Sequence, residues 1–116
     1  MKHTGRTDEV QGVFLGADFW EPGKRVFGKV VRPFDSKNGR CYTVKLGKPV
    51  EVLGEKEDVI AIGALKGFRM ALDATGIAEL KPGDSIVVEC TGKKEQGEGK
   101  SPMVEFELEV DTADGR

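Results

Sequence analysis

Residues 104–110 alternate between apolar and acidic side chains without exception, and this period of two constrains the fold more than any other feature. The polar positions are Glu105, Glu107 and Glu109, and the positions between them are apolar. Strict alternation is typical of a strand with one buried and one solvated face. The chain also holds sixteen glycines in 116 residues, which favours many turns over long helices. The sequence therefore predicts a mostly β domain.

Four further segments are predicted as strands. They are residues 24–34, residues 40–46 with a continuation after the interruption at 47–49, residues 59–62, and a strand that begins after the turn at 81–84. Gly28 lies inside the first of them, where a glycine usually marks a bend or a bulge. Asn38-Gly39 is a strong hairpin signal, and the charged run Glu55–Asp58 is predicted as a turn.

One segment changes its period. Leu65, Phe68 and Leu72 fall at helical spacing and Gly76 follows them, which predicts a helix over about residues 64–75. The predicted order is thus three strands, one helix and two strands. We expect an all-β fold with one helix, a five-stranded OB-fold Greek-key barrel with the helix between strands 3 and 4, because closure removes the sheet edges. A small sandwich and an SH3-like barrel are the alternatives, and neither expects a helix at this point.

We expect one domain over residues 12–111, with a flexible N-terminal tail at 1–11 and a short C-terminal tail at 112–116. No apolar run approaches the roughly 20 residues that span a bilayer, and the N-terminus does not resemble a secretory signal. These features predict a cytoplasmic protein. Cys41 and Cys90 are then expected to be reduced, half-buried thiols.

Positive charge is concentrated between Lys24 and Lys48. This segment holds eight lysines and arginines and a single acid, Asp35, for a local charge of +7, whereas the whole chain carries −2. An uneven distribution of charge along the chain gives information about binding partners rather than about the fold. It points to an anionic ligand, or else to a basic hairpin that meets an acidic face of this protein or of a second subunit.

Catalysis and metal binding find little support in the residue types. The one histidine, His3, lies in the predicted tail, and the two cysteines are 49 positions apart. No nucleophile therefore has a well-placed base, and no tetrahedral ligand set is evident. We expect a protein that is not an enzyme and needs no cofactor or metal.

Binding is better supported. Arg25, Phe27 and Lys29 alternate with Val26 and other inward positions, so they share the outer face of the first strand. A nucleic-acid single strand requires cations along its phosphates and flat rings under its bases. The alternative is that Phe27 packs under the N-terminal segment or against a second subunit.

The other aromatic residues are assigned by their position along the predicted strands. Tyr42 shares its face with Val44 and Leu46, which favours a core position over stacking. Trp20 and Phe34 lie at strand ends, where either role is open. The phenylalanines expected in the core are Phe14, Phe68 and Phe106.

Three stretches, residues 26–32, 39–44 and 82–88, together resemble the OB-fold single-stranded DNA-binding proteins, with the likeness covering about residues 20–110. The resemblance implies a groove flanked by the loops at 35–39 and 92–102, which carry Lys37 and Lys93, Lys94 and Lys100. Bacterial members of that family usually end in a long tail with an acidic tip. This chain has only about six residues after its last predicted strand, so we expect a compact phage-type or accessory binder rather than recruitment of partners through such a tail.

The predicted function is non-catalytic, largely sequence-independent binding of single-stranded DNA. The alternatives are a structural or protein-interaction module, which includes a homo-oligomer, and an RNA-binding OB module. The candidate binding residues are Trp20, Arg25, Phe27, Lys29, Arg32, Phe34, Lys37, Arg40, Tyr42, Lys45, Lys93 and Lys94.

Overall fold

The computed structural model describes residues 12–37, 39–63, 65–99 and 102–115. Its elements are β1 (Val13–Phe14), β2 (Arg25–Ser36), β3 (Gly39–Val52), β4 (Glu55–Ile62), α2 (Lys66–Ala74), β5 (Ser85–Lys94) and β6 (Met103–Asp111). The described part of the chain is thus mostly β with one helix, as the sequence predicted. The N-terminal tail predicted for residues 1–11 lies outside the described residues.

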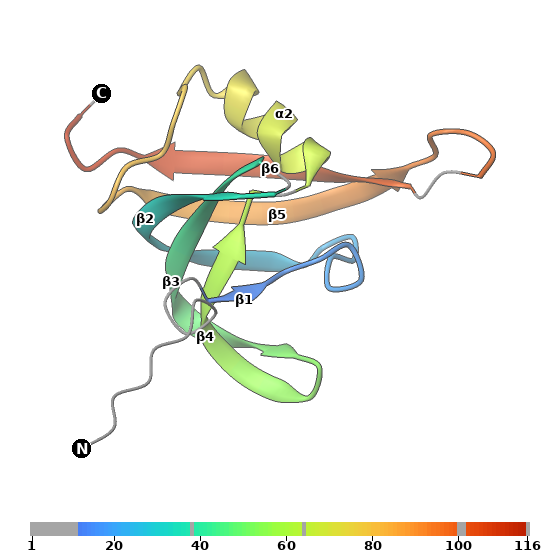
Figure 1. Cartoon of the computed structure of the whole chain (residues 1–116), viewed down its shortest axis with the longest axis horizontal. Helices are drawn as coiled ribbons and strands as arrows, with labels where there is room; N and C mark the ends of the chain where they lie inside the picture. The colour runs from blue at the N-terminus through green and yellow to red at the C-terminus, as the bar shows by residue number, and fades with distance from the viewer. Residues whose placement is uncertain (1–11, 38, 64, 100–101, 116) are drawn as a thin grey trace.

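All of these strands belong to one sheet, in the order β1-β4-β3-β2-β5-β6 (Figure 1). The pairs from β4 to β6 are antiparallel, and β1 pairs with β4 in parallel through Val13 and Phe14. The sheet is therefore open and six-stranded among the described residues, where the sequence predicted a closed five-stranded barrel. The difference arises because β1 extends the free edge of β4, and the N-terminal apolar patch could be assigned from sequence only as a short strand or a lid.

The sheet coils at β2, which pairs with β3 on one side and β5 on the other. Gly28 permits this because a Cβ there would lie 2.2 Å from the carbonyl oxygen of Lys45. The register between β2 and β3 shifts between Val30 and Arg32, so the bulge falls after the glycine rather than at it. Residues 25–30 therefore keep the alternation expected from the sequence.

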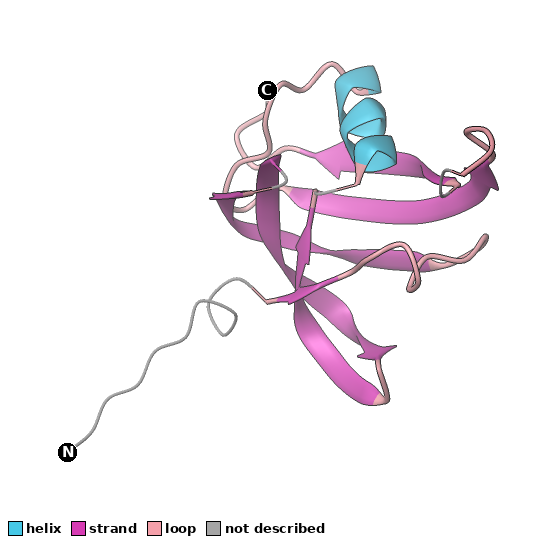
Figure 2. Ribbon diagram, turned by 45° about the vertical axis from the view of Figure 1, so that its right-hand side comes forward, coloured by secondary structure: helices cyan, strands magenta, loops and turns pink. Residues whose placement is uncertain are grey.

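The β3–β4 hairpin extends well beyond the body of the sheet (Figure 2). Its tip is a two-residue turn at Leu53 and Gly54, whereas the sequence predicted the turn at Glu55–Asp58. Those charged residues instead form the first half of β4, and Val50 pairs with Glu57 across the hairpin. The charged run did not mark the turn, because both faces of a projecting hairpin are solvated and its strands can carry charged residues as well.

The core lies between the coiled sheet and α2. It includes the fully buried Trp20, Tyr42, Phe68 and Leu72. The helix packs against β6, and a Cβ at Gly67 would lie 1.8 Å from the Val104 carbonyl oxygen, so the glycine sets this close approach.

The last two strands agree with the predicted alternation, and β5 extends to Lys94, into the segment predicted as a loop from residue 92. Cys41 and Cys90 are buried free thiols. None of the helices in the described residues is long and apolar enough to cross a membrane.

Candidate nucleic-acid interface

The outer face of β2 carries the group that the alternation predicted. Arg25, Phe27 and Lys29 are exposed, while Val26 and Val30 between and beyond them are buried. The Phe27 side chain is 47% exposed, so one part of its ring is available to a ligand. Phe27 and its two cationic neighbours therefore form one surface rather than a set of scattered charges.

A shallow pocket of about 400 Å³ lies beside Phe27 on this face. We call it the Phe27 pocket, and its lining residues are Phe27, Gly28, Lys29, Lys45, Leu46, Gly47, Ser85, Ile86 and Val87. A Cβ at Gly47 would lie 2.5 Å from Phe27 Cε2, so the ring rests directly against the glycine backbone. The pocket thus combines an apolar floor with two lysines from neighbouring strands, since Lys29 pairs with Lys45 in the β2–β3 register.

Phe27 also lines a second pocket, of about 240 Å³. Its charged lining residues are Lys24, Arg25 and Lys48 and one acid, Glu51, and Phe19 also lines it. The Lys24 ammonium lies 5.1 Å from the centre of the Phe19 ring, a cation–π distance. The two pockets have Phe27 as a common lining residue, and we call them together the candidate groove.

The same sheet face becomes acidic away from β2. Arg25 pairs with Glu89 on β5, which pairs with Glu107 on β6, and Phe27 is followed in the same way by Val87 and then Glu109. Cross-strand partners point to the same face of a sheet. One face therefore carries a basic lane on β2 and an acidic lane on β6, with Glu89 of β5 between them.

Lys45 is not a free cation, because its ammonium forms an ion pair and hydrogen bond with the Asp58 carboxylate across the β3–β4 pair. This hydrogen bond from Lys45 lowers the pKa of the Asp58 carboxyl below its usual value. Lys29, by contrast, has no ion pair within the described part of the chain.

Arg40 is also engaged. Its guanidinium lies 3.2 Å from Asp35 Oδ1 and 2.7 Å from Glu79 Oε1. These contacts connect the β2–β3 hairpin to the segment between α2 and β5. Arg40 therefore has a structural partner on each side, and its charge is largely compensated.

Trp20 and Tyr42 do not belong to the exposed surface. Both side chains are 0% exposed. Trp20 packs edge-to-face against Phe19 and Phe106, and the Tyr42 hydroxyl accepts a hydrogen bond from the Leu80 amide. The structure thus removes both rings from the set of stacking candidates, because no ring face is open to a base.

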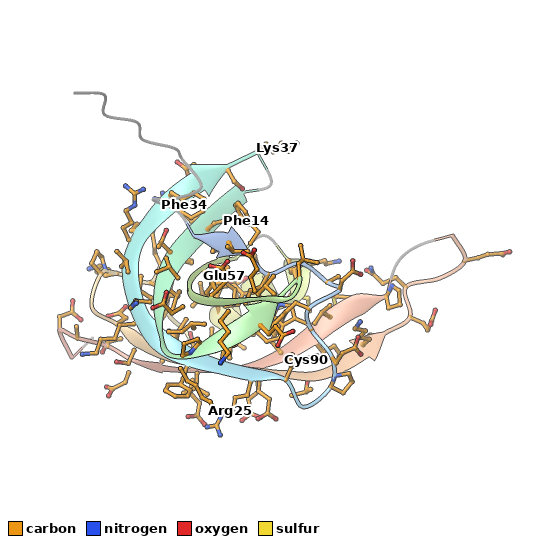
Figure 3. The ribbon with its side chains drawn as sticks, turned by 90° about the horizontal axis from the view of Figure 1, so that it is seen from below. Phe14, Arg25, Phe34, Lys37, Glu57 and Cys90 are labelled. Atoms are coloured by element: carbon orange, nitrogen blue, oxygen red, sulfur yellow. The ribbon has the colours of Figure 1, made fainter. Side chains whose placement is uncertain are left out.

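A second group of candidates lies at the other end of β2 (Figure 3). Phe34 packs edge-to-face on Phe14 with their ring centres 6.0 Å apart. Phe14 is 47% exposed, so the expectation that it belongs to the core was wrong. Arg32 and Lys37 are exposed at this end, and Figure 3 shows Lys37 on the opposite side of the molecule from Arg25. The structure does not bring these residues into the candidate groove.

Lys93 and Lys94 lie at the far end of β5. The Lys93 ammonium is 3.7 Å from Glu21 Oε1 and donates to the Ala17 carbonyl oxygen at 3.5 Å. Lys93 therefore holds the segment before β2 against β5, and neither lysine lines the groove.

The residues that line the groove and were not singled out from the sequence include Lys24, Gly47, Lys48 and Val87. Lys24 and Lys48 belong to the basic segment but were not predicted as binding residues. The alternation does not show where a side chain in a turn or bulge points. Gly47 interrupted a predicted strand, and this interruption was the one signal that could have revealed its role.

Within the described ranges, no group of three or more histidine, cysteine, aspartate or glutamate side chains is arranged to hold a metal ion. Comparison of the chain with models of protein families, with curated proteins and with solved structures gave no match. The candidate groove must therefore be interpreted from its own chemistry.

Proposed function

We propose that the chain is an OB-fold that binds single-stranded DNA, largely independently of sequence, along the candidate groove. The fold part is supported by the strand order β4-β3-β2-β5-β6, which is that of a five-stranded Greek-key barrel opened between its third and fifth strands. The helix α2 follows β4 in the chain and packs against β6, next to the opening.

The observation that carries the binding proposal is the exposed Phe27 ring, held on the Gly47 backbone between Arg25 and Lys29. A ring in this setting offers a π-face to any base, and the two cations neutralise phosphates on either side. Lys24 and Lys48 continue the positive charge into the second pocket. Stacking and phosphate contacts recognise no particular base, so we expect little sequence preference.

The direct test is a titration of a labelled oligo-dT by fluorescence anisotropy at several salt concentrations. With about four phosphates neutralised, the logarithm of the association constant should fall with the logarithm of salt at a slope of about −3. Binding that is absent at low salt, or that does not respond to salt, would overturn the proposal. Competition with the matched RNA oligomer measures the preference between the two sugars.

A substitution of Phe27 tests whether its ring stacks on a base. Phe27→Leu keeps an apolar side chain but loses the aromatic face, and the expected loss is about tenfold in affinity, since stacking contributes about 1–3 kcal/mol per base. Val31→Ala is the matched control, because Val31 is an equally exposed apolar residue of β2 outside the groove lining. Equal effects of the two substitutions would mean that the Phe27 ring makes no specific contribution to binding.

Gly47→Ala tests the geometry without removing the ring. The added Cβ would displace the Phe27 ring from its support, because the two would be 2.5 Å apart. We expect weaker binding of oligo-dT with little change in folding, since the ring lies on the surface.

A further inference from the structure

Leu53, at the tip of the β3–β4 hairpin, is an outlier in two respects. Its side chain is 100% exposed, and its φ of +52° lies in the left-handed region. Two-residue hairpin turns with positive φ favour asparagine, aspartate or glycine at this position, because a Cβ there is strained. Leu53 borders an open pocket that Phe14 and Phe19 also line, but its side chain gains no burial there. An outlier of this kind points to a role outside the fold.

The tip combines this apolar side chain with acidic neighbours. Glu51 and Glu55 are exposed on the two strands that enter and leave the turn. Val52 pairs with Glu55, and Glu51 pairs with the exposed Lys56, so the tip carries a net negative charge with one lysine in it. The hairpin therefore presents a leucine flanked by carboxylates. A surface that receives it should be apolar at its centre and basic at its rim.

The Phe27 pocket has this composition. Its floor is apolar, with Leu46, Ile86 and Val87 beside Phe27, and Lys29 lies on its rim. At about 400 Å³ it is large enough for a leucine side chain. We propose that the Leu53 tip of one copy of this chain docks in the Phe27 pocket of a second copy.

The contact must join two molecules. Gly47 lines the pocket, and Leu53 lies six residues further along the chain, just past the end of β3, which corresponds to about 20 Å of extended chain. The hairpin also projects away from the rest of the sheet (Figures 1 and 2). A tip that cannot reach its own pocket, but fits that of another copy, makes a head-to-tail contact that extends into open chains.

This inference goes beyond the proposed function and does not depend on it. If the candidate groove also binds single-stranded DNA, the hairpin of a neighbouring copy and the nucleic acid compete for Lys29 and Phe27. If it does not, the head-to-tail contact is unaffected.

Sedimentation velocity of the full chain tests the proposal. The wild type should sediment above its monomer mass of 12.6 kDa as concentration rises, and added salt should reverse this because the contact includes charge pairs. Leu53→Asn should remain monomeric, and it should also fold well, because asparagine tolerates a positive φ. Lys29→Glu should be monomeric as well, since the reversed charge repels the acidic tip.

Mixing the two variants gives the decisive measurement. Leu53→Asn keeps an intact pocket and Lys29→Glu keeps an intact tip, so the mixture should form a one-to-one heterodimer that cannot grow further. Met70→Asn is the control, because Met70 is an exposed apolar residue on α2 and its removal should leave association unchanged. Monomeric wild type up to about 1 mM, association of Leu53→Asn equal to that of the wild type, or no heterodimer on mixing would each overturn the proposal.

Oligo-dT titration of the same variants separates the two proposals. Leu53→Asn should bind oligo-dT as the wild type does in dilute solution, whereas Lys29→Glu should stay monomeric and bind oligo-dT about tenfold more weakly. Loss of association with retained oligo-dT binding in Leu53→Asn supports the hairpin contact. Failure of oligo-dT binding in every variant would count against the proposed function alone.

Discussion

Strands β2 and β6 follow the same alternation and lie two strands apart on one sheet face, yet their outer residues differ completely in charge. β2 presents Arg25, Phe27 and Lys29, and β6 presents Glu107 and Glu109 in the same cross-strand rows. Their inward residues are alike because both pack into one core. The comparison shows that the core specifies only every second residue of a strand, which leaves the other half free to direct a ligand.

The two charged lanes should determine where on this face an anionic ligand binds. If the proposed function holds, a phosphate backbone should be attracted to the β2 lane and repelled by the β6 lane, which would confine it to the groove beside Phe27. The acidic lane would then help to position the ligand by repelling it from β6.

The largest expected effect concerns the bend that β2 has and β6 lacks. Gly28→Ala places a Cβ 2.2 Å from the Lys45 carbonyl oxygen, a backbone atom that cannot move aside. We expect a destabilisation of about 3 kcal/mol or more, at the upper end of the cost of overpacking. Urea unfolding, followed by the fluorescence of the buried Trp20, measures it.

The matched control is Gly92→Ala in β5, where the nearest atom to the new Cβ is a Glu105 carboxylate oxygen at 3.6 Å. Its effect should be within about 0.5 kcal/mol. Similar losses in the two variants would mean that the close approach at Gly28 is not what bends the sheet.

A second prediction reverses one charge in each lane. Lys29→Glu should weaken oligo-dT binding about tenfold and reduce the salt slope by about 1, because one phosphate contact is lost. Glu109→Lys should strengthen binding severalfold, because it removes a repelling charge from the same face. Changes of the same sign in anisotropy titrations at fixed salt would refute the two-lane description.

A third prediction compares two arginines of the basic segment. Arg25→Gln should weaken oligo-dT binding severalfold with little effect on stability. Arg40→Gln should leave binding nearly unchanged and lower stability by less than about 1 kcal/mol, as expected for partly exposed pairs such as those with Asp35 and Glu79. The pattern is checked by titration and urea unfolding of both variants, and an equal loss of binding would show that the Arg40 charge is accessible.

The smallest effect concerns Asp58. The Lys45 hydrogen bond lowers its pKa in the folded state, so the pair stabilises the fold above the usual aspartate range and this contribution is lost as the pH falls through the lowered pKa. Below that pH Lys45 is released. A carboxyl NMR titration should show the Asp58 midpoint rising towards its ordinary value in Lys45→Gln, and an unchanged midpoint would exclude the pair in solution.

Much of the fold could be predicted from local pattern. The alternation at residues 104–110 and the spacing of Leu65, Phe68 and Leu72 correspond to β6 and α2. The hairpin turn was placed two residues late, at Glu55–Asp58, because charged residues mark solvent exposure and the turn itself contains a leucine. Closure of the barrel could not be decided, since it depends on which strand reaches the edge of β4.

The candidate site was only partly predictable. The alternation of buried and exposed residues along β2 was sufficient to predict that Arg25, Phe27 and Lys29 are exposed on one face. It could not show that Arg40 is tied to Glu79, which lies 39 positions away in the sequence. It also could not show that Trp20 is covered by Phe106, since that contact joins the two ends of the chain.

By itself, then, the sequence determined which residues alternate, where the helix lies and that positive charge is concentrated between Lys24 and Lys48, because each of these is a property of neighbouring residues. Only the tertiary structure decided which of those cations remain unpaired, which aromatic rings remain open, and that Gly47 supports Phe27. These depend on contacts between distant segments, which no local period encodes. The full exposure of Leu53 is another feature that only the tertiary structure shows, because it depends on how the hairpin projects from the sheet.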